Sequence, residues 1–216
     1  MANIFPKWTN KIPTALAVAA PIALTLVVAA IWYWFSPWYT DVGYEPEQPV
    51  PYSHKFHAGD LAIDCRYCHN TVEKADFAAV PPTSTCMNCH KEIATDSPKL
   101  AKVRESAENG TSIPWVKIHQ LPDYAYFSHQ VHTNAGVGCV SCHGRVDQME
   151  KVYLAKPLSM SWCLDCHRNP EPHLRPQSEI TNMDWDQKAA GYDPSKHVNR
   201  AGNKVVPPEH CSGCHR

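Results

Sequence analysis

The sequence predicts a largely irregular chain with short α-helices, little or no β-structure and one membrane-spanning helix near its N-terminus. Three observations lead to this fold class. All ten cysteines fall into five copies of one short motif, C-x-x-C-H. Nineteen prolines interrupt a chain of 216 residues, which disfavours long helices and central strands. An uncharged apolar run covers residues 15–35, which is the length that a bilayer requires.

The five C-x-x-C-H motifs are the pattern by which a polypeptide attaches c-type haem. The two thiols form thioethers with the porphyrin, and the histidine behind them meets the iron from one face. One helical turn places both sulfurs along the same porphyrin edge. The predicted attachment residues are Cys65, Cys68, Cys86, Cys89, Cys139, Cys142, Cys163, Cys166, Cys211 and Cys214. The predicted proximal ligands are His69, His90, His143, His167 and His215, so the expected cofactors are five covalently bound haem c groups with their iron.

Zinc sites and disulfides are the alternative interpretations of ten cysteines. A tetrahedral zinc site usually takes two C-x-x-C pairs, and five pairs cannot be shared evenly between such sites. A disulfide framework has no use for a histidine directly after every second cysteine. Because the histidine recurs five times and no cysteine is left over, the sequence favours haem attachment over both alternatives.

Five haems on a chain of this size change what we expect the core to be made of. Residues 41–216 provide only about 35 residues for each of five haems, which is too little protein for five separate pockets. We therefore expect the haems to pack against each other and to form much of the core themselves. The predicted fold class is a multihaem cytochrome c, mostly irregular, with a short helix at each motif.

The apolar run at 15–35 predicts a single membrane anchor. As a helix it would span about 32 Å. Lys7 and Lys11 precede it, and the first charged residues behind it are acidic, which places the N-terminus in the cytoplasm. A cleaved signal peptide is the alternative, because small residues at 28–30 resemble a cleavage site. The length of the run and its continuation into bulky aromatic residues favour the anchor.

The sequence therefore predicts four regions. They are a cytoplasmic N-terminus at 1–14, a transmembrane helix at 15–35, a linker at 36–51 and a haem domain at 52–216 on the periplasmic side of the bacterial inner membrane. Within the haem domain, S-H-x-x-H followed by two C-x-x-C-H motifs occurs twice, at 52–90 and at 127–167. This repetition predicts two duplicated di-haem modules, with a fifth haem site appended at 211–215.

Each iron needs a second axial ligand if its haem is to carry electrons rather than bind a substrate. Two histidines on one helical turn cannot both reach the same iron, so we expect one to serve its own module and the other a neighbouring haem. His54 is assigned to the haem at Cys65 and His129 to the haem at Cys139. The predicted distal ligands are His54, His57, His119, His129 and His132. Met149, Met160 and His173 are further candidates, whereas His210 and His197 are expected at the surface.

Four stretches of the chain resemble one known family along nearly its whole length. They are VGYEPEQPVPYSHKFHAGDLAIDCRYCHN, VPPTSTCMNCH, WVKIHQLPDYAYFSHQVHTNAGVGCVSCHGRVDQM and SWCLDCHRNPEP. They look like the pentahaem cytochrome c subunit of bacterial alternative complex III, a quinol:electron acceptor oxidoreductase. The resemblance implies an iron–sulfur subunit, polytopic quinol-binding membrane subunits and a monohaem cytochrome as partners. The shorter histidine and cysteine pattern also resembles small class III multihaem cytochromes and the haem subunit of menaquinone reductase complexes.

The expected function is electron transfer within a quinol-oxidising membrane complex, toward a soluble periplasmic acceptor. No catalytic residue is expected in this chain, and nucleic acid is not an expected partner. One alternative is a haem subunit that passes electrons the other way, to quinone. Another is a multihaem reductase, which needs an open or lysine-bound iron. Eight histidines outside the motifs make an open iron unnecessary, which favours the electron-transfer interpretation.

Overall fold

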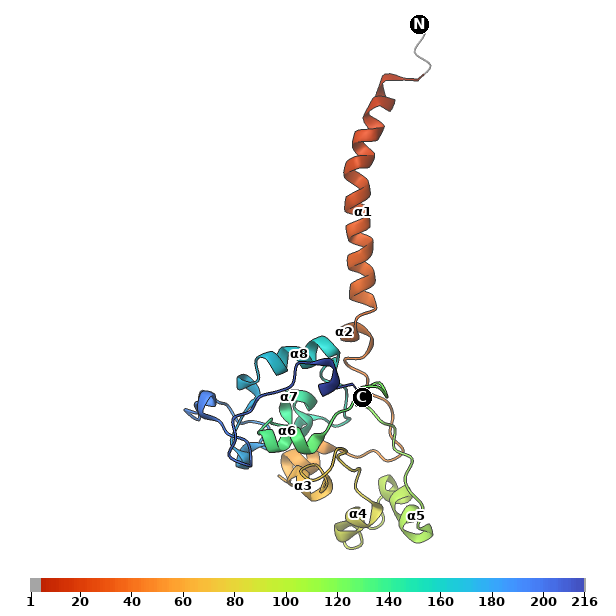
Figure 1. The fold of residues 1–216 in the computed structure, drawn as a ribbon. Helices are drawn as coiled ribbons and strands as arrows, with labels where there is room; N and C mark the ends of the chain where they lie inside the picture. The colour runs from red at the N-terminus through yellow and green to blue at the C-terminus, as the bar shows by residue number, and fades with distance from the viewer. Residues whose placement is uncertain (1–4, 216) are drawn as a thin grey trace. The chain divides into compact units, whose positions relative to one another are not determined.

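The computed structural model describes residues 5–215, and the chain divides into two compact units, Met1–Asp41 and Val42–Arg216. The first unit consists of η1 (Lys7–Lys11), α1 (Ile12–Trp34) and α2 (Pro37–Thr40). Figure 1 shows α1 as one continuous helix that is much longer than the others. Among the described residues it is the one helix long and apolar enough to cross a membrane.

The helix α1 begins three residues before the predicted span and ends one residue before its end. Pro13 lies in its first turn, where a missing backbone N–H costs nothing. Pro21 lies inside the helix, and Thr25 Oγ1 donates a hydrogen bond of 2.9 Å to the Pro21 carbonyl oxygen. An uncleaved anchor and a signal sequence share the length and composition of this helix, so the anchor stays a prediction.

The second unit is built of short helices joined by irregular chain, as the sequence predicts (Figure 1). Among the described residues there is no strand, and the pairings Val137 with Leu174 and Val198 with Lys204 are isolated bridges. Its α-helices are α3 (Cys65–Cys68), α4 (Thr83–His90), α5 (Ala101–Asn109), α6 (His129–Ala135), α7 (Val140–His143) and α8 (Met160–Arg168). Single turns complete it: η2 (Lys55–Asp60), η3 (Pro98–Leu100), η4 (Val146–Gln148), η5 (Glu171–His173), η6 (Gln177–Glu179), η7 (Pro194–Lys196) and η8 (Cys211–Gly213).

Side-chain caps fix where several of these short helices begin. Asp64 accepts a hydrogen bond of 2.8 Å from the backbone N–H of Arg66 at the start of α3. Ser128 and Ser159 cap α6 and α8 in the same way. A cap satisfies a backbone N–H that has no partner within the helix, and it matters most where a helix is only one or two turns long.

The polypeptide buries few apolar side chains of its own. Among the described residues, the buried hydrophobic ones are Val50, Val103, Met149, Leu154, Leu174 and Ile180. The accessible surface is 14924 Å², whereas a compact monomer of 24.2 kDa exposes about 10,000 Å². The exposed helix α1 accounts for part of this difference. The small core of the second unit accords with a fold in which something other than apolar side chains supplies much of the interior.

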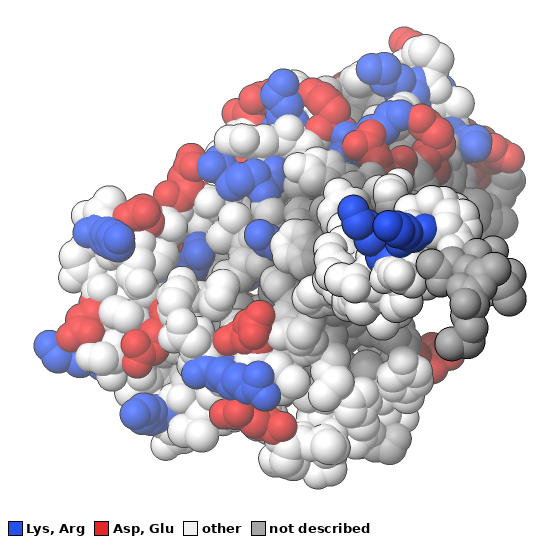
Figure 2. Space-filling view, turned by 90° about the horizontal axis from the view of Figure 1, so that it is seen from above, with Lys and Arg blue, Asp and Glu red and all other residues white. Residues whose placement is uncertain are grey.

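Polar contacts connect segments of the second unit that are distant in sequence. Arg66 pairs with Asp64 and Glu73, and Arg200 reaches the same Glu73 carboxylate at 2.7 Å. Thr181 donates a hydrogen bond of 2.9 Å to Asp64. These contacts hold the segments around 181 and 200 against the first C-x-x-C-H turn. On the face shown in Figure 2, positive and negative side chains are interspersed rather than gathered by sign.

Candidate haem-binding sites

Each C-x-x-C-H motif lies on a single turn of helix. The second and fourth motifs lie within α4 and α8, the third consists of Cys139 and the whole of α7, and the first and fifth begin with α3 and η8 and continue past their ends. In the first, third and fifth motifs the backbone N–H of the histidine donates to the carbonyl oxygen of the first cysteine, at 2.8, 3.0 and 2.8 Å. All ten cysteines are free, so every pair is available for thioether attachment. Before haem is attached, burial raises the pKa of the Cys139 and Cys142 thiols to about 12, so both thiols are protonated at neutral pH.

Seven histidines share one hydrogen-bonding arrangement. In each, Nδ1 lies within hydrogen-bonding distance of a backbone carbonyl oxygen, and because a carbonyl only accepts, Nδ1 carries the proton. Nε2 then keeps its lone pair, which is the tautomer that metal-ligating histidines adopt when a backbone carbonyl orients them. The histidines are His57, His69, His90, His129, His132, His167 and His215, with distances of 2.6–3.1 Å.

The rings of predicted proximal and distal histidines lie about 6 Å apart at three of the sites. The ring centroids of His57 and His90 lie 6.1 Å apart. The corresponding distances are 6.3 Å for His129 and His143 and 6.1 Å for His132 and His167. Two imidazoles that bind one metal from opposite sides have centroids about 6 Å apart, since each metal–nitrogen bond is about 2.0 Å long. The donor set at these three sites therefore fits an iron with two axial histidines.

His54 and His119 each carry a buried ring nitrogen without a hydrogen-bond partner among the described atoms, Nδ1 in His54 and Nε2 in His119. Such groups are rare in folded proteins unless a ligand or water satisfies them. Burial, and then the nearby His69, lowers the pKa of His54 to about 4. His54 is therefore neutral at pH 7, which is the form that ligates metals. The His119 ring lies 4.4 Å from that of His143, so both predicted ligands lie near motif histidines.

His197 corrects an expectation from the sequence. The sequence predicts it at the surface, yet it is only 8% exposed. Its Nε2 donates to the Ala135 carbonyl oxygen at 2.7 Å, and its Nδ1 accepts from the Tyr192 hydroxyl. Because both ring nitrogens are occupied by protein groups, His197 has no lone pair for a metal. Its role is to hold the segment around 192–197 against the end of α6.

The remaining ligand candidates lie in different environments. Met149 is 4% exposed and Met160 is 61% exposed. His173 is half-buried, and burial lowers its pKa. His210 is exposed, as the sequence predicts. His173 has no ring contact with a motif histidine among the described contacts, and the assignment of Met149, Met160 and His173 as ligands stays a prediction.

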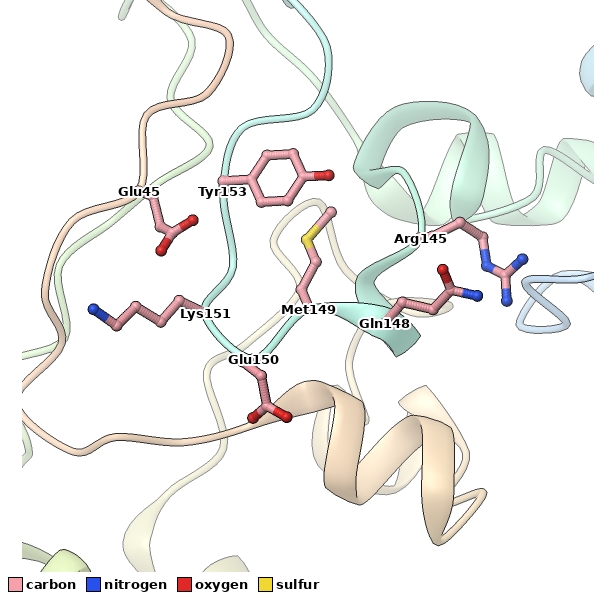
Figure 3. Close-up of a pocket in the computed structure, with 7 residues that line it drawn as sticks. All are labelled: Glu45, Arg145, Gln148, Met149, Glu150, Lys151 and Tyr153. Carbon is pink, nitrogen blue, oxygen red and sulfur yellow. The ribbon is translucent and has the colours of Figure 1, made fainter.

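A pocket of about 460 Å³ lies over the segment that follows α7. Figure 3 shows Met149 in its middle, between Tyr153 and Gln148. Charged groups of both signs, including Glu45 and Lys151, form its rim (Figure 3). Sequence reasoning does not find this pocket, because Glu45 comes to it from about 100 positions before the other lining residues, which all lie at 145–153, and no local pattern marks them.

Sequence reasoning also missed two aromatic residues, Tyr52 and Phe127. Each stands two positions before the first histidine of an S-H-x-x-H motif, and each ring stacks on the second histidine of that motif. The signal was visible in the sequence, because an aromatic residue occupies this position in both modules.

The repeated cysteine turns and the oriented histidines beside them define a c-type cytochrome with several haem sites. Comparison with known proteins agrees with this class. Residues 125–216 match the family model described as cytochrome c7 and related cytochrome c. Over 178 residues, which are 72% of this chain and 83% of the relative, the sequence is 31% identical to "Menaquinone reductase, multiheme cytochrome c subunit" of Nitratidesulfovibrio vulgaris.

The chain belongs to the multihaem cytochrome c family. Membership implies that C-x-x-C-H residues hold covalently bound haem c. The matched residues of the family model contain the second module and the C-terminal motif, whereas the first module precedes them.

Proposed function

We propose that this chain is a membrane-anchored electron-transfer subunit that holds five haem c groups in a quinol-oxidising complex of the alternative complex III type. The three histidine pairs with rings about 6 Å apart are the observation that carries the proposal, because two histidine ligands leave an iron no position for substrate. A haem c with two such ligands takes up and releases one electron at a time. The chain itself is then a scaffold for electron transfer and contributes no catalytic side chain.

The proposed ligands follow the two modules. In the first, His54 serves the site of His69 and His57 serves that of His90. In the second, His129 serves the site of His143 and His132 serves that of His167. The ring distances at His57, His129 and His132 support these pairings.

At the C-terminal site the described ring contact of His215 is with an aromatic residue, not with a histidine. His119 is the fifth predicted distal histidine, but its ring lies beside His143. The described ring contact of His215 is with Tyr124, at 5.8 Å. A methionine or His173 as the sixth ligand remains the alternative for this site, and a methionine would raise its potential above that of its neighbours.

The location and the partners are part of the same proposal. The anchor α1, with Lys7 and Lys11 before it, supports a cytoplasmic N-terminus and a periplasmic haem domain. The resemblance to alternative complex III supports an iron–sulfur subunit, polytopic quinol-binding subunits and a monohaem cytochrome in the complex. A soluble periplasmic protein would take up the electrons.

A second candidate is the same scaffold used in the other direction, to deliver electrons to quinone. The name of the relative from Nitratidesulfovibrio vulgaris, a menaquinone reductase subunit, favours this direction. The fold of this chain is compatible with both directions of electron flow, because the arrangement of iron ligands does not depend on which haem of the chain is reduced first.

Rapid mixing of the purified membrane complex with a reduced quinol analogue, in the presence of an oxidised periplasmic electron acceptor, tests the proposal. Quinol oxidation predicts that the haem absorbance shows reduction within a turnover and that the acceptor is then reduced. Haems that are reduced only by a periplasmic donor, followed by reduction of added quinone, would support the second direction. Haems that exchange electrons with neither quinol nor quinone would contradict both.

A further inference from the structure

The two S-H-x-x-H motifs are preceded by an aromatic residue that contacts both histidines in the same way. The Tyr52 ring stacks on His57 at 4.5 Å with an interplanar angle of 22°. The Phe127 ring stacks on His132 at 4.4 Å with an angle of 29°. Against the first histidine of each motif, His54 or His129, the aromatic ring is edge-on at 4.8 Å and 87° in both modules.

The intervening serine repeats its contacts as well. The Ser53 carbonyl oxygen lies 2.9 Å from His57 Nδ1, and the Ser128 carbonyl oxygen lies 2.8 Å from His132 Nδ1. Each serine hydroxyl also accepts a backbone N–H three residues on, at 3.0 Å from Phe56 and 3.5 Å from Val131. The aromatic residue, the serine and the two histidines thus form one local unit that occurs twice.

The serine and the aromatic residue restrict the second histidine in different ways. A hydrogen bond to Nδ1 fixes the direction in which Nε2 points, but it allows the ring to rotate about the hydrogen-bond axis. A flat ring packed against one face opposes that rotation. Together the two contacts determine both the direction of Nε2 and the plane of the imidazole.

The two modules share the position of the aromatic residue but not its hydroxyl. Tyr52 carries one and Phe127 does not, yet their ring geometries agree within 0.1 Å and 7°. The ring face is therefore the shared functional element. Tyr124 contacts His215 differently, at 5.8 Å and 34°, so stacking at this distance distinguishes the two modules from the C-terminal site.

We infer that Tyr52 and Phe127 are positioning residues that set the imidazole planes of His57 and His132 as axial ligands. This inference rests on the proposed function, in which these two histidines ligate iron at the sites of His90 and His167. Loss of the stacked ring leaves the ligand in place but frees its plane. The orientation of axial imidazole planes affects the magnetic anisotropy of a low-spin iron, and a freed ligand also dissociates more readily.

The test compares Tyr52→Leu and Tyr52→Phe in the purified complex, with Tyr44→Leu as a matched control. Among the described contacts, Tyr44 has no ring contact with a histidine. We expect Tyr52→Leu to shift or broaden one low-spin electron paramagnetic resonance signal and to raise cyanide binding at that iron by about tenfold or more. Tyr52→Phe and Tyr44→Leu should both match the wild type. Phe127→Leu provides the same test in the second module if Tyr52→Leu fails to mature.

Three results would overturn the inference, and the first two separate it from the proposed function. If His57→Ala converts one haem to high spin while Tyr52→Leu and Phe127→Leu keep wild-type spectra and cyanide binding, the ligation holds and the positioning role is wrong. If His57→Ala leaves every haem low-spin, the ligation itself is wrong and the inference fails with it. A loss in Tyr52→Phe equal to that in Tyr52→Leu would show that the hydroxyl, not the ring face, is responsible.

Discussion

Replacement of Asp64 by alanine should loosen the first haem-attachment turn without touching a cysteine or a histidine. Asp64 precedes α3, and its carboxylate accepts from the backbone N–H of Arg66 at 2.8 Å. The same carboxylate takes two further hydrogen bonds from the Arg66 guanidinium at 2.8 Å and one from Thr181 at 2.9 Å. These contacts, led by the Arg66 side chain, lower the pKa of Asp64 to about 2.

The expected magnitude follows from the separate contacts. Loss of an N-terminal cap costs about 1 kcal/mol. The ion pair contributes about 0.5 kcal/mol, because its two side chains are 40% and 42% exposed and solvent screens them. The bond from Thr181 adds about 0.5 kcal/mol. A total of about 2 kcal/mol corresponds to about 30-fold more frequent opening of the turn.

Hydrogen exchange followed by mass spectrometry measures this opening directly. In the haem-loaded complex, Asp64→Ala should accelerate exchange in a peptide that covers residues 61–72 by about 30-fold. Asp64→Asn retains the cap and should accelerate it by only about two- to threefold. A peptide from α5 (Ala101–Asn109) should be unchanged and serves as the internal control. Equal exchange in wild type and Asp64→Ala would refute the view that this carboxylate organises the turn.

The lowered pKa of Asp64 also gives this contribution a pH dependence. Because the folded pKa lies below the unfolded value of about 3.9, the ionic part is fully present above pH 4 and is lost as the pH falls toward 2. The difference in exchange between wild type and Asp64→Asn should therefore shrink over this interval.

Three further predictions concern other parts of the molecule. His54→Ala should convert one haem toward high spin and raise its potential while all haems stay attached; unchanged low-spin spectra would rule out the assignment. Gly136→Ala should destabilise the haem domain, since Gly136 has φ +88° and an added Cβ would lie 2.5 Å from the His197 ring; an unaltered thermal midpoint would contradict this. An unrelated single-span helix in place of residues 15–35 should still anchor the haem domain. The complex should nevertheless lose its polytopic subunits on detergent purification, because the alanines of the native segment permit close helix approach. A complex that assembles and turns over normally would show that the segment is only a tether.

The sequence predicts the parts of this structure that depend on short stretches of chain. Each C-x-x-C-H motif forms its turn from local hydrogen bonds, so the positions of all five turns follow from the motifs themselves. The helix at 12–34 follows from composition alone and differs from the predicted 15–35 only at its ends. It begins three residues earlier, with Pro13 in its first turn, and it ends one residue earlier, at Trp34. The scarcity of strands follows from the same reasoning.

Contacts between distant segments could not be predicted in this way. His197 was misjudged because its two partners, Tyr192 and the Ala135 carbonyl, become neighbours only in the folded chain. The position of His119 beside His143 depends on the path of the irregular linker before it. The aromatic residue at position 52, in contrast, could have been predicted from the sequence, because comparison of the two modules already shows an aromatic residue at that position in both.

The central claim is that five irons, each held by two protein ligands, make this chain an electron-transfer scaffold. A reductive titration of the purified complex, followed by haem absorbance with carbon monoxide added at the end, tests it most directly. After the contribution of the proposed monohaem partner is subtracted, the account predicts five one-electron equivalents in the haem c of this chain, low-spin spectra for these five haems and no carbon monoxide complex with them. Four or fewer equivalents in fully matured protein, or a haem that binds carbon monoxide in the wild type, would contradict it.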